Sequence, residues 1–236
     1  METKIKICGL TRQQDIEYCN EALPDFIGFV FAKSRRQVSF KTAEGLKASL
    51  DNRIKSVGVF VNDDIPFIKR LCVQGIIDYI QLHGDEDNSY IQCLTDQLVK
   101  ADCLKPIIKA VRVKDAQSLS KAGQYCTDFL LLDTFTDKEY GGTGRSFDWE
   151  LVGRLRVSGS LSNSCGLSGT SGLNVMDKPF FLAGGLNYTN VIQAINTARP
   201  FCVDISSGVE SSGVESNGVK DGAKIKNIVN LIRSVK

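Results

Sequence analysis

Eight short apolar runs recur along this 236-residue chain, and an amphipathic or polar segment separates each run from the next. Most of the runs are continuous rather than alternating, which is typical of strands that are buried on both faces. A strand followed by a helix, eight times over, predicts an α/β protein with a single-domain (β/α)8 TIM barrel over residues 1–236. The runs are Lys4–Cys8, Phe26–Phe31, Ser56–Val61, Tyr79–His83, Ile107–Val113, Phe129–Asp133, Pro179–Ala183 and Phe201–Ser206.

An open, doubly wound α/β sheet is the alternative architecture. A nucleotide-binding sheet of that kind carries a GxGxxG run directly after its first strand. The first apolar run of this chain instead continues as Cys8-Gly9-Leu10-Thr11, which lacks that spacing. The barrel is therefore the preferred prediction.

Three segments lie outside the strand–helix pattern. Residues 157–177 are rich in Ser and Gly, which predicts a flexible insertion on the barrel face opposite the chemistry. The glycine-rich run 140–145 predicts a loop that closes over a substrate. A tandem SGVES repeat at 207–211 and 212–216 is too short for a repeat architecture, so we expect it to lengthen the loop after the eighth strand.

Composition excludes several classes of partner. The 29 basic and 27 acidic residues are well mixed and leave a net charge of +2, so we expect no nucleic-acid partner. No stretch approaches a membrane span and the N-terminus lacks an apolar signal core, which favours a cytoplasmic protein with no membrane partner. The eight cysteines show no CxxC spacing and the chain has one histidine, so we expect no metal site.

In barrels of this class, chemistry sits at the carboxyl ends of the strands. Cys8 ends the first apolar run and Asp133 ends the sixth. A thiol and a carboxyl group can serve as a base and an acid across one pocket, so these two are the candidate catalytic residues. His83 ends the fourth run, where it either lines the pocket or packs against the backbone.

Two glycine-containing loops follow the last two runs. Gly184 and Gly185 come after the seventh run, and Ser206, Ser207 and Gly208 come after the eighth. Glycines let backbone N–H groups approach a bound anion, and serine hydroxyls add donors. Because phosphate sites in barrels recur at these two loops, we expect the loops to bind the phosphate of a small-molecule substrate.

Strand periodicity makes a separate prediction about the barrel interior. If Cys8 points inward, Lys6 points inward as well. An unpaired ammonium is too costly to bury. Barrel closure places the eighth strand beside the first, so Asp204, two residues before the end of its own strand, becomes the predicted partner of Lys6.

A set of short runs, spread along essentially the whole chain, carries a resemblance to a known family. In chain order the runs are Lys6–Thr11 (KICGLT), Gly28–Phe31 (GFVF), Ser34–Ser39 (SRRQVS), Val57–Asn62 (VGVFVN), Gln81–Gly84 (QLHG), Leu132–Thr134 (LDT), Gly141–Gly144 (GGTG), Phe147–Trp149 (FDW), Ala183–Asn187 (AGGLN) and Val203–Glu210 (VDISSGVE). With these runs in the same order, the chain resembles the phosphoribosylanthranilate isomerase family of tryptophan biosynthesis, whose fold is a (β/α)8 barrel.

The resemblance implies a reaction and residue roles. The family carries out an Amadori rearrangement of N-(5-phosphoribosyl)anthranilate to the corresponding 1-deoxyribulose phosphate, without a cofactor. The family's general base matches Cys8, its general acid matches Asp133, and the arginine that holds the anthranilate carboxylate matches Arg36. The chain is expected to be a monomer or a homodimer. Departures from the family pattern are confined to the 157–177 insertion and the duplicated pentapeptide.

Two other functions compete with this one. An aminoaldose isomerase of histidine biosynthesis would run the same chemistry on the same barrel, but it normally has an aspartate at the position of Cys8 and two similar halves. A catalytically silent barrel that binds a phosphorylated metabolite is the second alternative. Retention of both Cys8 and Asp133 disfavours it.

Overall fold

The computed structural model describes residues 2–113, 115–134, 149, 178–211 and 218–235. Its strands form one closed parallel barrel in the order in which they occur along the chain, which confirms the predicted fold. The strands are β1 (Lys4–Cys8), β2 (Phe26–Val30), β3 (Lys55–Phe60), β4 (Tyr79–Leu82), β5 (Ile107–Val113), β6 (Phe129–Thr134), β7 (Phe180–Ala183) and β8 (Cys202–Ile205).

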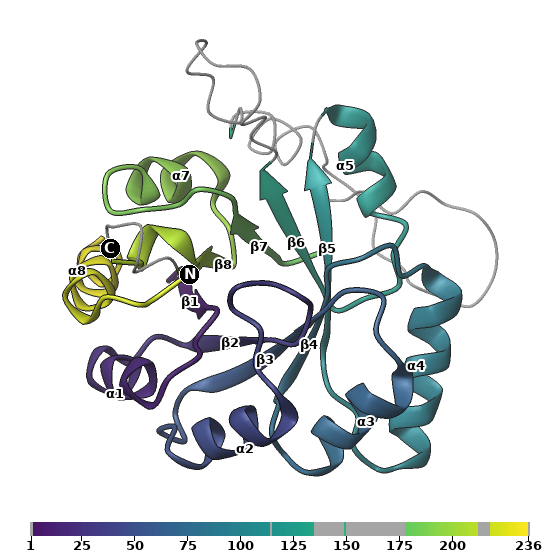
Figure 1. Cartoon of the computed structure of the whole chain (residues 1–236). Helices are drawn as coiled ribbons and strands as arrows, with labels where there is room; N and C mark the ends of the chain where they lie inside the picture. Colours follow the sequence, from purple (N-terminus) through teal and green to yellow (C-terminus); the bar gives the residue numbers. More distant parts are fainter. Residues whose placement is uncertain (1, 114, 135–148, 150–177, 212–217, 236) are drawn as a thin grey trace.

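Helices surround this barrel on the outside (Figure 1). Several of them begin at a side chain that caps the first turn: Ser39, Asp87 and Asp221 each accept a hydrogen bond from a backbone N–H three residues later. The helices are α1 (Gln13–Ala22), α2 (Phe40–Ala48), α3 (Ile65–Val73), α4 (Asn88–Lys100), α5 (Ala116–Ala122), α7 (Val191–Ala198) and α8 (Gly222–Ser234), with a short 3₁₀ turn, η2 (Ser207–Val209), after β8.

The insertion at 157–177, the glycine-rich run 140–145 and the second copy of the pentapeptide lie outside the described residues. The predictions made for them stay predictions. Within the described part of the chain, no helix is long and apolar enough to cross a membrane. The same residues contain no group of three or more His, Cys, Asp or Glu side chains that could hold a metal ion.

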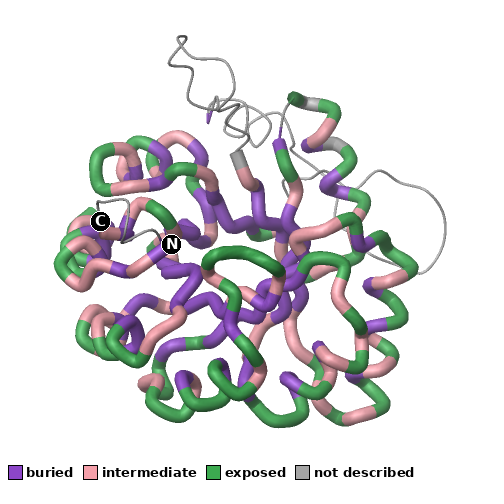
Figure 2. Tube along the Cα trace, in the orientation of Figure 1, coloured by how far each residue is buried: buried purple, intermediate pink, exposed green. Residues whose placement is uncertain are grey.

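The two faces of each strand pack into two different apolar clusters. One large apolar cluster fills the space between the strands and the helices, and exposed residues lie on the outer sides of the helices (Figure 2). A second, smaller cluster lies inside the barrel and contains Phe26, Leu131 and Phe181. Alternation along each strand therefore assigns every second residue to the barrel interior.

Aromatic rings close one end of this interior. Phe26, Tyr79 and Phe129 are the first residues of β2, β4 and β6, and their rings contact one another or Phe181 and Phe201 at centroid distances of 5.2–6.5 Å. They form a plug at the amino ends of the strands. The carboxyl ends of the strands, where sequence reasoning placed the site, lie at the opposite end of the barrel.

Candidate active site

Cys8 is the last residue of β1 and is 9% exposed. Its neighbour on β2 is Gly28, where a Cβ atom would lie only 2.7 Å from the Cys8 Sγ atom. Glycine at this position leaves room for the thiol at the barrel mouth. Burial raises the pKa of the Cys8 thiol, and the nearby Lys6 and Lys220 ammonium groups oppose that shift without cancelling it.

Asp133 lies near the end of β6, on the strand face that carries Phe129 and Leu131 into the barrel interior. Its carboxyl group is 30% exposed, and its Oδ2 atom lies 3.3 Å from Nε2 of His83. Strands β1 and β6 are separated by β7 and β8 in the closed barrel, so Cys8 and Asp133 stand on well-separated strands at the same carboxyl end.

The His83 side chain contacts two other side chains. These are Asp133 through Nε2 and Gln81 through Nδ1, the latter at 3.1 Å from the Gln81 Nε2 atom. These contacts place the ring beside the candidate acid, and its role in lining the substrate pocket stays a prediction.

The loop that follows His83 is fixed by a buried ion pair. Lys109 Nζ lies 2.7 Å from Oε2 of Glu86, and both side chains are 1% exposed. Glu86 also accepts hydrogen bonds from the backbone N–H groups of Asn62 and Gly84, and Lys109 donates to the Gly84 carbonyl oxygen. These contacts tie the loops after β3 and β4 to β5, which restricts the position of His83.

The predicted Lys6–Asp204 pair is confirmed. The two residues are register partners on β1 and β8, and Lys6 Nζ lies 2.7 Å from Asp204 Oδ2. Burial by itself would lower the pKa of Lys6, but Asp204 and Cys8 outweigh it and hold that pKa above its usual value. The ammonium also donates to Oε1 of Gln81 at 2.8 Å. Gln81 was missed as a site residue, although the alternation that placed Lys6 inside the barrel also applies to it, two residues before His83.

The Arg36 side chain packs over Gly9, the residue that follows Cys8. A Cβ atom on Gly9 would lie 2.4 Å from the Arg36 Cδ atom, and Gly9 has a φ of +84°, so two separate constraints favour glycine there. The Arg36 Nε atom donates to Glu210 Oε1 at 2.6 Å. This contact leaves the side chain close to Cys8 at the rim of the barrel.

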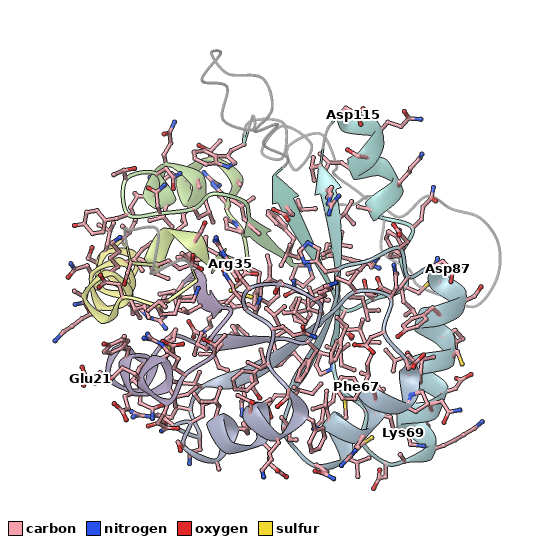
Figure 3. The ribbon with its side chains drawn as sticks, viewed as in Figure 1. Glu21, Arg35, Phe67, Lys69, Asp87 and Asp115 are labelled. Carbon is pink, nitrogen blue, oxygen red and sulfur yellow. The ribbon has the colours of Figure 1, made fainter. Side chains whose placement is uncertain are left out.

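Glu210 was also missed by sequence reasoning. It is the glutamate of the first pentapeptide copy, is 7% exposed, and contacts three cationic side chains, those of Arg35, Arg36 and Lys220. Burial would raise the pKa of Glu210, but Arg36 and Lys220 outweigh it and lower that pKa. Figure 3 labels Arg35 close to β1 and the segment after β8. Two sequence signals could have found it: it closely follows the predicted phosphate loop, and it ends the family-like run Val203–Glu210.

The two predicted phosphate loops lie against each other. Gly184 and Gly185 have φ angles of +96° and +63°, and no atom lies within 4 Å of a Cβ built on Gly185. A Cβ on Gly208 would lie 2.0 Å from the carbonyl oxygen of Leu186, so the loop after β8 approaches the loop after β7 closely. Ser207 begins the η2 turn. The backbone of these loops can therefore approach an anion from the side of Gly185.

The Ser206 hydroxyl, a predicted phosphate donor, makes a hydrogen bond within the protein. Its Oγ atom donates to the carbonyl oxygen of Cys8 at 3.1 Å, and its own carbonyl accepts from Lys220 Nζ at 3.0 Å. Ser206 therefore ties the loop after β8 to the end of β1. The hydroxyl hydrogen is used within the protein because barrel closure brings the Cys8 carbonyl within reach.

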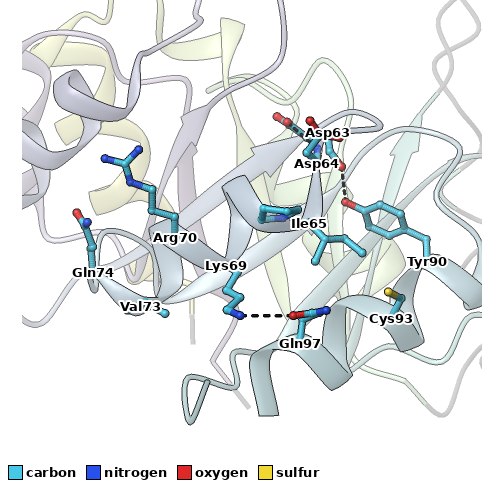
Figure 4. Close-up of a pocket in the computed structure, with 11 residues that line it drawn as sticks. Asp63, Asp64, Ile65, Lys69, Arg70, Val73, Gln74, Tyr90, Cys93 and Gln97 are labelled. Carbon is cyan, nitrogen blue, oxygen red and sulfur yellow. Dashed lines mark hydrogen bonds between the residues drawn. The ribbon is translucent and has the colours of Figure 1, made fainter. Parts of the chain in front are cut away.

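A separate groove lies between α3 and α4 on the helical layer (Figure 4). At one end Tyr90 donates its hydroxyl hydrogen to the Asp63 carbonyl oxygen at 2.6 Å, and at the other Lys69 contacts Gln97 at 3.4 Å. None of the candidate catalytic or phosphate-binding residues lines this groove.

Fold and site together define a (β/α)8-barrel enzyme, with a thiol, a carboxyl group and two glycine loops at the carboxyl end of its barrel. Residues 5–231 match the family model described as N-(5'phosphoribosyl)anthranilate (PRA) isomerase. The chain belongs to this family.

Curated and solved relatives agree with the family match. The N-(5'-phosphoribosyl)anthranilate isomerase of Endomicrobium trichonymphae is 45% identical over 98% of this chain and 99% of its own length. The crystal structure of phosphoribosyl anthranilate isomerase from Thermotoga maritima has a TM-score of 0.77 and 32% identity, covering 99% of this chain and 100% of that one. Another solved phosphoribosyl anthranilate isomerase, in complex with reduced 1-(o-carboxyphenylamino)-1-deoxyribulose 5-phosphate, has a TM-score of 0.75 and 29% identity, with the same coverage.

Proposed function

We propose that this protein isomerises N-(5'-phosphoribosyl)anthranilate to 1-(2-carboxyphenylamino)-1-deoxyribulose 5-phosphate, by general acid–base catalysis and without a cofactor. The observation that carries the proposal is the presence of Cys8 and Asp133 at two strand ends of one barrel, in a chain that belongs to this family. A solved relative holds a reduced analogue of the product, which supports a phosphorylated small-molecule substrate here.

In the first step Asp133 acts as the general acid. Its proton passes to the ribose ring oxygen while the bond between that oxygen and C1′ breaks. The nitrogen lone pair then forms the C1′=N double bond of an iminium ion. Such a proton transfer contributes about 10²–10⁴-fold to a rate.

In the second step Cys8 acts as the general base. The thiolate takes the C2′ proton, and the electron pair of that C–H bond forms the C1′=C2′ double bond and neutralises the iminium nitrogen. The resulting enolamine tautomerises to the ketone. Burial raises the pKa of Cys8, and the ammonium groups of Lys6 and Lys220 offset the charge of a thiolate here.

We assign substrate binding to residues at the rim of the barrel. Arg36 holds the anthranilate carboxylate, while Gly184, Gly185, Ser207 and Gly208 surround the phosphate through backbone N–H groups. A cytoplasmic location suits this chemistry, because Cys8 must remain a free thiol and thiols stay reduced in that compartment.

The decisive experiment follows the fluorescence of freshly prepared phosphoribosylanthranilate in the presence of the purified protein. We expect the substrate fluorescence to decay with enzyme concentration. Binding without decay would favour the silent barrel. Turnover confined to the histidine-pathway aminoaldose would instead favour the other isomerase.

A further inference from the structure

One chain of side-chain contacts crosses the barrel interior and links the surroundings of the thiol to the carboxyl group. It runs from Asp204 on β8 to Lys6 on β1, then to Gln81 on β4, to His83 just after β4, and to Asp133 on β6. The successive separations are 2.7, 2.8, 3.1 and 3.3 Å. Lys6 and Gln81 are 0% and 1% exposed, so bulk water does not reach the contact between them.

The hydrogen-bonding capacities of these groups fix the direction of every contact. An ammonium has donors only, so the Gln81 atom beside Lys6 must be the amide oxygen. The amide NH₂ group of Gln81 therefore faces His83, and it can only donate. The Nδ1 atom of His83 must then accept, which leaves the proton of a neutral imidazole on Nε2.

We infer that Gln81 is a positioning residue that holds His83 as the neutral Nε2–H tautomer, so that Asp133 delivers its proton from Oδ1. His83 Nε2 lies 3.3 Å from Asp133 Oδ2, so this tautomer places an N–H group, and not a lone pair, beside that oxygen. The acidic proton of Asp133 is then carried by the other oxygen, Oδ1, and we expect that oxygen to face the substrate. The ammonium of Lys6 therefore determines, through Gln81 and His83, which oxygen of Asp133 carries the proton.

The same geometry excludes His83 as the general acid. An imidazolium carries hydrogens on both ring nitrogens, so its Nδ1–H would point at the NH₂ group of Gln81. Reversing the Gln81 amide would relieve that clash, but would then aim the NH₂ group at the Lys6 ammonium. The catalytic part of this inference rests on the proposed function, whereas the tautomer of His83 does not.

The tautomer can be measured directly because His83 is the only histidine of the chain. Protein labelled with ¹⁵N-histidine gives the two ring nitrogens of this residue alone, and protonated and unprotonated nitrogens resonate far apart. At pH 7 we expect the wild-type protein to show a protonated Nε2 and an unprotonated Nδ1. A protonated Nδ1 in the wild-type protein overturns the inference without any variant.

Gln81→Glu provides the second test. One carboxylate oxygen keeps the contact with Lys6, and the other offers His83 an acceptor where the amide offered a donor. We expect Nδ1 to become protonated and kcat to fall on the order of 10- to 100-fold, with KM changed less than about threefold, because Gln81 acts behind His83. Gln81→Met, which has a similar volume and no donor, should lose the single tautomer and give a smaller fall in kcat.

The matched control is Gln92→Glu, the same substitution on the exposed face of α4. It should leave both His83 resonances and kcat unchanged. Unchanged ring resonances in Gln81→Glu would overturn the inference, whatever the activity. If the expected tautomer is found in a protein that does not turn over phosphoribosylanthranilate, the proposed function fails while the role of Gln81 in setting the tautomer stands.

Discussion

The ammonium of Lys6 lies 2.7 Å from Asp204, across the seam where the first and last strands of the barrel meet. Both side chains are almost entirely shielded from bulk water, with exposed fractions of 0% for Lys6 and 8% for Asp204. The pair sits directly below Cys8, so it is both part of the core and part of the electrostatic surroundings of the thiol.

Removing one member of this pair should destabilise the fold strongly. Lys6→Met leaves Asp204 buried without its counter-ion, and we expect a loss of about 3–5 kcal/mol in the free energy of unfolding. The double variant Lys6→Met/Asp204→Leu should lose much less, because no charge is stranded. Urea unfolding of the single and double variants measures both values, and equal losses would contradict a coupled pair.

Cys8→Ser should keep the fold and lose most of the turnover. A hydroxyl group is a far weaker base than a thiolate, so kcat should fall by about 10²-fold or more. The fluorescence assay gives kcat, and far-ultraviolet circular dichroism checks the fold. Cys202→Ser, also inside the barrel but away from the mouth, is the matched control and should retain kcat in the folded fraction. Near-normal kcat in Cys8→Ser would show that another group is the base.

Asp133→Asn should also keep the fold and lose most of the turnover, because this variant lacks the general acid. The amide keeps the shape of the side chain but has no proton to transfer at neutral pH, so kcat should fall by about 10²-fold or more. The His83 contact can persist through the amide oxygen, so KM should change little. A large rise in KM with kcat preserved would instead make Asp133 a binding residue.

Arg36→Met should raise the Kd of anthranilate-bearing ligands by about 10- to 100-fold, because a charge-assisted hydrogen bond contributes about 1.5–3 kcal/mol. The affinity for a bare sugar phosphate should change little. Lys at this position should restore only part of the loss, since an ammonium cannot form a bidentate contact with a carboxylate. Calorimetric titration with both ligands separates the cases. Equal losses for the two would place Arg36 at the phosphate.

The Glu86–Lys109 pair should make stability depend on acid pH. Burial would raise the pKa of Glu86, but hydrogen bonds from Lys109 and from backbone N–H groups outweigh it and hold that pKa below its ordinary value of 4.5. A lowered pKa means that the stabilisation is fully present above the unfolded value and is lost as the pH falls through the folded value. The Tm of the wild-type protein should therefore fall between pH 6 and pH 3. The Tm of Glu86→Gln/Lys109→Met should fall less over the same range. An unchanged decline in that double variant would assign the acid sensitivity to other carboxyl groups.

The sequence alone determined the closed barrel and the Lys6–Asp204 pair between its first and last strands. Both depend on regular features that survive without coordinates: the spacing of apolar runs along the chain, the alternation of side chains along a strand, and the rule that closure makes the last strand a neighbour of the first. The positions of Cys8 and Asp133 at strand ends follow from the same features. So does the placement of the glycine loops after β7 and β8.

Only the tertiary structure decided which polar groups meet once the barrel had closed. The link from Gln81 through His83 to Asp133 depends on side-chain directions across several strands, and no spacing in the sequence encodes it. The contact of Arg36 with Glu210 joins residues 174 positions apart. The Ser206 hydroxyl donates to the carbonyl oxygen of Cys8 because the closed seam brings that carbonyl within hydrogen-bonding distance. Periodicity fixes the face on which a side chain lies, but a hydrogen bond requires its partner within about 3 Å, and the packing of the whole barrel sets that distance.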